Sequence, residues 1–189
     1  MVTQSNEARR RDARMEVSMT KQAISVDIGG TAIKMARIDA HGKILDKWRM
    51  DTNISDSGIH IPGEIGDAID AHLSSADRAE LVGIGVGVPG SISPDGFTVV
   101  RAVNLGWHEL PLRAKLEQRF KLPVTLLNDA NAAALGEMWQ GAGRGTRSMM
   151  FVTLGTGVGA GIILDGKIIN GAHSACGEVG HIPVRSSEH

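Results

Sequence analysis

The sequence predicts an α/β layered protein in which two related halves, each beginning with strands, close on one ligand. Segments with the pattern of strands alternate with segments typical of helices along residues 23–138. A turn rich in glycine and threonine follows a short apolar strand twice, at residues 29–31 and again at residues 155–157. Each copy is followed by a second strand and therefore predicts a hairpin. The repetition favours two half-domains of common design.

The first half is expected to open with three strands. Residues 23–28 are apolar at positions 24, 26 and 28, which is the alternation of a half-buried strand. A second strand follows the turn, and a third runs from Lys43 to Met50 after a turn that contains Asp39 and Gly42. Residues 51–60 are rich in turn-forming residue types and predict a loop.

Helices and strands are expected to alternate after this loop. Pro62 suits the first turn of a helix whose apolar stripe recurs every four residues at Ile61, Ile65, Ile69 and Leu73. Residues 81–88 predict a strand with glycine at 83, 85 and 87, so that another backbone or a ligand can approach one face closely. A helix opened by Pro111, a buried strand at 123–127 and an alanine-rich helix at 130–138 complete this half.

The second half repeats the opening of the first. At a constant offset Val26 falls on Val152, Gly29 on Gly155 and Asp39 on Asp165. Residues 148–170 therefore predict an antiparallel meander, and the glycine-rich residues 141–146 a hinge before it. We expect a disordered tail at 1–22, a first α/β domain at 23–138 and the beginning of a second, incomplete domain at 139–189.

Composition excludes several classes of protein. The 189 residues contain no apolar run of eighteen, so a membrane span is not expected. A net charge of −1 gives no electrostatic reason to expect nucleic acid. The polar residues 1–22 lack the apolar core of a secretory signal, and the single cysteine, Cys176, fits a reducing compartment. A cytoplasmic protein is predicted.

The two turns are typical of phosphate binding. Successive exposed N–H groups of a glycine-rich turn form a cradle for an anion, and Asp27, just before the first turn, can hold a metal ion beside phosphates. Residues 155–160 also fit a dinucleotide fingerprint, but that motif must open a helix and a hairpin pattern follows here. No P-loop sequence is present.

Asn128 and Asp129 stand where a predicted strand meets a predicted helix. Asp129 could simply cap the helix. Alternatively, the helix dipole would keep its carboxylate ionised and ready to accept a proton as a general base. The residues themselves leave both roles open.

Six segments, taken together and in this order, resemble the ROK family of bacterial sugar kinases and sugar-responsive repressors. They are Asp27-Ile-Gly-Gly-Thr, Gly87-Val-Pro-Gly, Asn104-Leu-Gly-Trp, Leu127-Asn-Asp-Ala-Asn-Ala-Ala-Ala-Leu-Gly-Glu, Leu154-Gly-Thr-Gly-Val-Gly and Gly177-Glu-Val-Gly-His. The resemblance runs from about Ala23 to Val184. It implies the actin-like ATPase fold, which is ribonuclease H-like, and a kinase that uses ATP and Mg²⁺.

The resemblance also implies roles for individual residues. Asp129 would be the catalytic base, and the hexose would be held by Gly90, Asn104, Asn128, Asp129, Glu178 and His181. The first phosphate site would comprise Asp27, Gly29, Gly30, Thr31 and Lys34, with Asp27 near Mg²⁺, and the second Thr153, Gly155, Thr156 and Gly157. Lys34 could equally be a surface lysine, and Trp107 either a pocket wall or a core residue.

The resemblance further implies zinc, because His181 is a zinc ligand in the family. The cysteine segment that supplies the other ligands does not follow it here, and Cys176 corresponds to none of them, so no stable zinc is expected in this chain. The predicted activity is phosphorylation of a hexose at its 6-hydroxyl, as by a glucokinase. N-acetylmannosamine or N-acetylglucosamine kinase, a non-catalytic sugar-binding remnant and a relative of the repressors without its DNA-binding domain are the alternatives. A homo-oligomer is expected.

Overall fold

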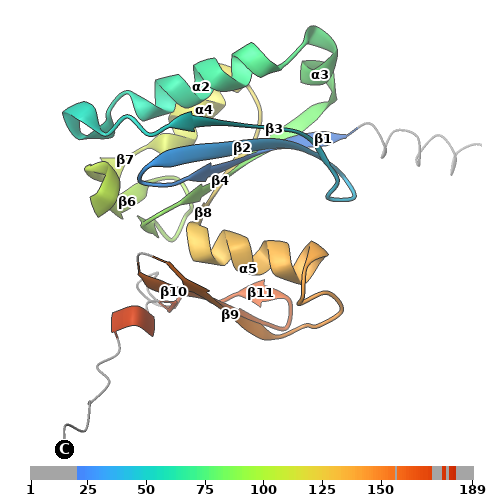
Figure 1. Ribbon diagram of the computed structural model, residues 1–189, viewed down its shortest axis with the longest axis vertical. Coiled ribbons are helices and arrows are strands. Elements are labelled where there is room, and N and C mark those ends of the chain that lie inside the picture. Colours follow the sequence, from blue (N-terminus) through green and yellow to red (C-terminus); the bar gives the residue numbers. More distant parts are fainter. Residues whose placement is uncertain (1–20, 156, 172–175, 178, 182–189) are drawn as a thin grey trace, which may run out of the picture.

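Two β-sheets lie on opposite sides of one helix in the computed structural model, which describes residues 21–155, 157–171, 176–177 and 179–181 (Figure 1). The first sheet has the order β3-β2-β1-β4-β8. Its strands are β1 (Gln22–Ile28), β2 (Ala32–Asp39), β3 (Ile44–Asp51), β4 (Leu81–Val88) and β8 (Val124–Asn128). β1 pairs antiparallel with β2 and parallel with β4, and β4 pairs parallel with β8. All five strands were expected from the sequence.

Helices α2 (Ile61–His72), α3 (Ser75–Glu80) and α4 (Leu112–Phe120) cover one face of this sheet (Figure 1). The stripe predicted for α2 is confirmed, since Ile61, Ile65 and Ile69 are completely buried in the main core. The apolar residues of β1 belong to the same core. Burial of such side chains, at about 25 cal/mol per Å², is the main source of stability here.

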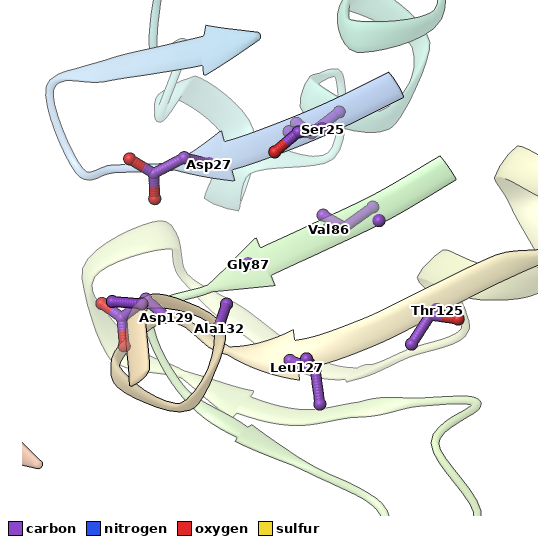
Figure 2. A pocket seen from close by; sticks show the side chains of 11 residues that line it. Ser25, Asp27, Val86, Gly87, Thr125, Leu127, Asp129 and Ala132 are labelled. Atoms are coloured by element: carbon purple, nitrogen blue, oxygen red, sulfur yellow. The ribbon is translucent and has the colours of Figure 1, made fainter. Parts of the chain in front are cut away.

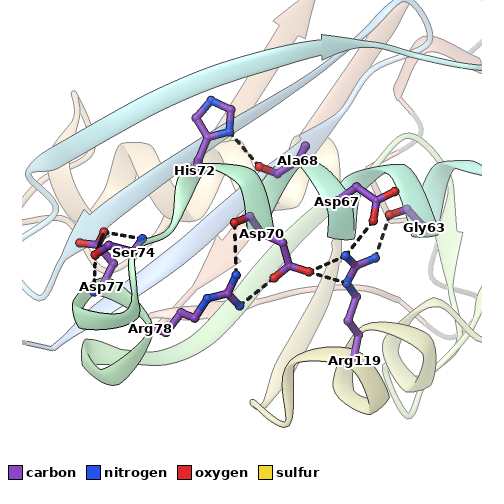
Figure 3. A network of polar contacts seen from close by, with 9 residues as sticks. All are labelled: Gly63, Asp67, Ala68, Asp70, His72, Ser74, Asp77, Arg78 and Arg119. Carbon is purple, nitrogen blue, oxygen red and sulfur yellow. Dashed lines mark hydrogen bonds and ion pairs between the residues drawn. The ribbon is translucent and has the colours of Figure 1, made fainter.

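Charged side chains fasten α2 to its neighbours (Figure 3). Arg119 of α4 donates hydrogen bonds to Asp67 at 2.8 Å and to Asp70 at 3.0 Å, and Arg78 pairs with Asp70 at 2.7 Å. Partial burial alone would raise the pKa of the Asp70 carboxyl, but the hydrogen bonds from Arg119 and Arg78 hold this pKa below its ordinary value. The ionised form of Asp70 is therefore part of how the helical layer is held.

Short elements between β4 and α4 were not predicted. β5 (Ser91–Ile92), β6 (Val99–Ala102) and β7 (Trp107–Leu110) form a small antiparallel sheet, with the 3₁₀ turn η2 (Val103–Leu105) between β6 and β7. A second 3₁₀ turn, η1 (Ser55–Gly58), comes from the loop after β3 and contacts β7. Trp107 is 4% exposed, and its Nε1 donates to the Gly58 carbonyl at 3.0 Å. Of the two roles considered for Trp107, the structure supports the core residue.

Helix α5 (Asp129–Gln140) lies between the first sheet and the second (Figure 1). The second sheet is the predicted meander of β9 (Met149–Leu154), β10 (Val158–Leu164) and β11 (Lys167–Ile168), followed by η3 (Val179–His181). A Cβ atom at Gly161 would lie 2.5 Å from the Ala134 Cβ and 2.7 Å from the Ala130 carbonyl oxygen. Helix and second sheet thus meet at contact distance through glycine and alanine. Among the described residues, no helix is long and apolar enough to cross a membrane.

Candidate functional site

The parallel pairing of β1, β4 and β8 brings three predicted motifs to one edge of the first sheet. The first glycine turn follows β1, Pro89 and Gly90 follow β4, and Asp129 follows β8. Ligands of open α/β sheets bind outside the carboxyl ends of parallel strands. The topology therefore assembles a site from segments that are far apart in the sequence.

A cavity of about 560 Å³ lies at this edge, between the first sheet and the second hairpin. It is lined by many of the residues predicted for the site, namely Gly29, Gly30, Gly90, Asn104, Asn128, Asp129, Thr153, Gly155 and Gly157. Thr31, Asp27 and Lys34 do not line it. Both glycine turns thus face one cavity, as the duplicated motif led us to expect.

The first turn is held rigidly by its neighbours. The Gly29 N–H donates to the Ala32 carbonyl at 3.1 Å, and a Cβ at Gly29 would lie 2.7 Å from that oxygen. Thr52, just after β3, donates its hydroxyl to the Gly29 carbonyl at 2.7 Å and its N–H to the Thr31 carbonyl at 3.0 Å. Glycine is required at 29 because a side chain would collide with backbone.

The second turn is less constrained. The Gly155 N–H donates to the Gly157 carbonyl at 2.9 Å, and no atom lies within 4 Å of a Cβ built at either glycine. Thr156, predicted to bind phosphate, lies outside the described residues. Thr153, the last residue but one of β9, also lines the cavity.

Asn128, rather than Asp129, is the N-cap of α5. Its Oδ1 accepts from the N–H groups of Ala130 at 3.0 Å and Asn131 at 3.3 Å, while its Nδ2 donates to the Gly90 carbonyl at 3.2 Å. Asp129 is the first helical residue, and its carboxylate accepts from the Ala130 N–H at 2.8 Å. The capping role considered for Asp129 therefore belongs to its neighbour. An amide nitrogen carries two hydrogens, so the Asn128 side chain has a second N–H that can donate to a ligand.

Asp27 and Asp129 both line a second cavity of about 400 Å³, which lies between the first sheet and α5 (Figure 2). Asp129 lines both cavities. Lys34 stands opposite Asp27 on β2, with its Nζ 3.9 Å from Asp27 Oδ2, and both side chains are mostly exposed. Lys34 therefore lies beside Asp27, one strand position beyond the Ile28–Ile33 pair that closes the first turn, and both residues line a further hollow on β2 and β3.

The acidic residues at the site are better suited to Mg²⁺, which can share its ligands with substrate phosphates, than to a metal ion bound by protein side chains alone. Among the described residues there is no group of three or more histidine, cysteine or acidic side chains that could hold a metal ion. Mg²⁺ commonly binds through one or two carboxylates together with substrate phosphates and water. Asp27 fits that use, because its side chain is 57% exposed at the cavity edge.

The last predicted residues are described only in part. Glu178 lies outside the described residues, and for His181 only the backbone is described, as the end of η3. The neighbouring Gly177 and Gly180 both line the larger cavity. The fold therefore brings this segment to the site, while the expectations about zinc and about the Glu178 and His181 side chains stay predictions.

The larger cavity is also lined by three residues that were not predicted to belong to the site: Asn131, Asn170 and Cys176. The Nδ2 of Asn131 donates to the Oδ1 of Asn170 at 3.1 Å, across 39 positions in the chain. A sequence signal existed only for Asn131, which stands three residues after the N-cap and so shares its side of the helix. Nothing in the sequence pattern pointed to Asn170.

The chain is similar in sequence to known sugar kinases and repressors. The family model described as the ROK family matches residues 23–189. A glucokinase of Halalkalibacterium halodurans is 50% identical over 163 residues, which cover 85% of this chain and 49% of that protein. A xylose repressor of Caldicellulosiruptor bescii is 35% identical, over 85% of this chain and 41% of the repressor.

The fold is shared with solved structures. A ROK family glucokinase from Streptomyces griseus, in complex with glucose and AMPPNP, is 39% identical with a TM-score of 0.73. The match covers 87% of this chain and 51% of that one. The protein has the actin-like ATPase fold of such sugar kinases. The chain spans about half the length of the curated relatives it matches.

Proposed function

Because the chain belongs to the ROK family, we propose that the protein catalyses the ATP-dependent phosphorylation of a hexose, with Asp129 as the general base. The observation that carries this proposal is the position of Asp129. It starts a helix and lines two cavities, one of which has a glycine turn from each half of the molecule in its wall. A hexose hydroxyl and a terminal phosphate can meet there.

In the proposed reaction, the Asp129 carboxylate accepts the proton of the attacking hexose hydroxyl, which we assign as the 6-hydroxyl. Gly90, Asn104 and the remaining N–H of Asn128 would orient the sugar. The phosphates would be bound by N–H groups of the two glycine turns other than those of Gly29 and Gly155, which donate within the turns. Glu178 and His181 would complete the sugar site. Mg²⁺, when bound near Asp27, neutralises phosphate charge. Positioning and electrostatics supply most of the acceleration in such transfers.

Glucose is the proposed hexose. Four of the relatives, one at 50%, two at 41% and one at 38% identity, carry the name glucokinase, and one solved relative holds glucose. A putative N-acetylmannosamine kinase from Listeria monocytogenes is less similar, at 31% identity. Turnover compared between glucose and the two N-acetylhexosamines decides between these substrates.

The test of the proposal is Asp129→Asn in the intact gene product. Asparagine cannot take the proton, so kcat should fall by roughly 10² to 10⁴-fold, the usual contribution of a positioned general base. Hexose affinity, measured by calorimetry, should stay within a few-fold. The melting temperature should change little, because Asn128 caps the helix and is untouched.

Asp165→Asn is the matched control. Asp165 is an exposed residue with φ of 49°, a conformation that asparagine tolerates, and it is remote from both cavities. This variant should keep normal turnover. Near-normal turnover of Asp129→Asn would refute the assignment of the base, and hexose binding without any turnover in the unsubstituted protein would favour a non-catalytic sugar-binding role.

A further inference from the structure

Helix α5, which carries Asp129, packs closely on the second sheet and less closely on the first. Toward the second sheet, Ala134 is completely buried, and Gly161 leaves no room for a Cβ against it. Toward the first sheet lies the 400 Å³ cavity, with Ala132 and Ala133 on the helix side and Gly85 and Thr125 on the sheet side (Figure 2). No atom lies within 4 Å of a Cβ built at Gly85. Packing therefore ties the middle of α5 mainly to the second sheet.

The first turn of α5 is buried at Ala130 against the second sheet, and a side-chain hydrogen bond adds to this packing at the cavity edge. Asn131 supplies this bond, since its Nδ2 donates to the Oδ1 of Asn170 at 3.1 Å. The N–H of the same residue donates to the Asn128 side chain, which in turn reaches the Gly90 carbonyl. Asn131 thus joins the N-cap, on the side of the first sheet, to the end of the second sheet.

Asn170 has a second contact on its other side. Its carbonyl accepts from the Cys176 N–H at 3.2 Å, and the carbonyl of the following Gly177 accepts from the Ala160 N–H at 2.9 Å. One residue therefore holds both the start of the catalytic helix and the segment that leads directly in sequence to Glu178.

We propose that Asn131 is a positioning residue for Asp129, and that its hydrogen bond to Asn170 sets the orientation of the first turn of α5 at the hexose cavity. The proposal rests on the proposed kinase function. Asn131 acts on turnover through Asp129 and does not hold the sugar. A small error in the placement of a base lowers the rate strongly, whereas sugar affinity depends on groups elsewhere in the cavity.

The kinetic test uses Asn131→Ala, Asn170→Ala and the double variant. Each single variant should lower kcat about five- to tenfold, the value of one lost hydrogen bond, and KM for the hexose should change less than about threefold. The double variant should be no slower than the slower single variant, because both changes remove the same bond. A rise in KM with multiplying effects would overturn the proposal in favour of direct sugar contacts. Unchanged kcat would reduce the bond to a surface contact.

Asn170→Asp is the conservative variant. A carboxylate still accepts from the Asn131 Nδ2, so this variant should keep at least half of the normal kcat, unlike Asn170→Ala. A loss as large as that of Asn170→Ala would contradict the proposal. Asn53→Ala serves as the matched control, because Asn53 also donates its amide to another side chain, Glu64, but lines neither cavity. It should leave kcat unchanged.

Hydrogen exchange separates failure of this proposal from failure of the proposed function. Asn170→Ala should raise the exchange rates of the amides at 130–133 about fivefold, the value of one hydrogen bond, whether or not the protein phosphorylates a sugar. Unchanged exchange at these amides would overturn the positioning role even in an active kinase. Faster exchange in a protein without kinase activity would support the hydrogen bond and reject the function.

Discussion

The two hairpins, β1–β2 and β9–β10, have the same local pattern and different surroundings. β1 pairs Ile28 with Ile33 across residues 29–32, whereas β9 pairs Leu154 with Val158 across residues 155–157. The second turn is thus one residue shorter. The first is braced by Thr52, and a side chain at Gly29 would collide with backbone, while Gly155 has open space around it. The two turns line the same cavity, but the first is tightly packed and the second has open space around its glycines.

Burial differs even more than turn geometry. Ile24, Val26 and Ile28 of β1 are each 1% exposed, and the positions that match them in β9 are 52%, 45% and 80% exposed at Met150, Val152 and Leu154. Helices α2 and α4 cover the first face, whereas α5 lies on the opposite face of the second sheet (Figure 1). The same apolar pattern therefore forms both hairpins, but only the strand that is covered by a neighbouring layer buries these side chains and gains stability from them.

The largest effect expected from this comparison concerns matched core positions. Ile28→Ala should lower the free energy of unfolding by about 2–5 kcal/mol, as for other buried large-to-small changes. Leu154→Ala should change it by less than about 0.5 kcal/mol, as at exposed sites. Urea denaturation followed by circular dichroism measures both. Equal losses would mean that the outer face of β9 is covered in solution.

A smaller effect is expected at the two turns. Gly29→Ala forces the turn apart from the Ala32 carbonyl and should cost about 1–3 kcal/mol, the usual price of overpacking. Gly155→Ala meets no atom and should stay within about 0.5 kcal/mol of the unsubstituted protein. The same denaturation experiment checks both variants. A costly Gly155→Ala would show that the second turn is as constrained as the first.

The smallest expected effect is on the pH dependence of stability. It tests the ion pairs in the layer of helices that covers the first sheet, a layer that the second hairpin lacks among the described residues. Because the pKa of Asp70 is lower in the folded than in the unfolded chain, its contribution is complete above the unfolded value, about 3.9, and is lost as pH falls through the folded value. Asp70→Asn should therefore flatten the dependence of the urea midpoint on pH below about 4. An unchanged pH dependence would argue against the ion pairs of Asp70.

Local patterns in the sequence determined much of the fold. Alternation at 24, 26 and 28 specified β1, a four-residue repeat specified α2, and the duplicated glycine turns predicted both hairpins and the ligand class. These features depend on neighbours within a few positions, and such spacings are visible in a sequence. The short strands β5, β6 and β7 escaped prediction because their pairing depends on tertiary packing around Trp107.

Only the tertiary structure showed which residue caps α5 and which residues from distant segments lie together at the candidate site. The pair Asn128 and Asp129 was consistent with either residue as the cap, and the hydrogen bonds assign the cap to Asn128. Lys34 belonged to the first motif by position, and the structure places it beside Asp27, where neither residue lines the cavity that the two turns share. Asn170 lies 39 residues beyond Asn131 and carries no pattern, so its contact with α5 exists only once the second sheet packs on that helix. Contacts between distant segments depend on packing, which no local spacing records.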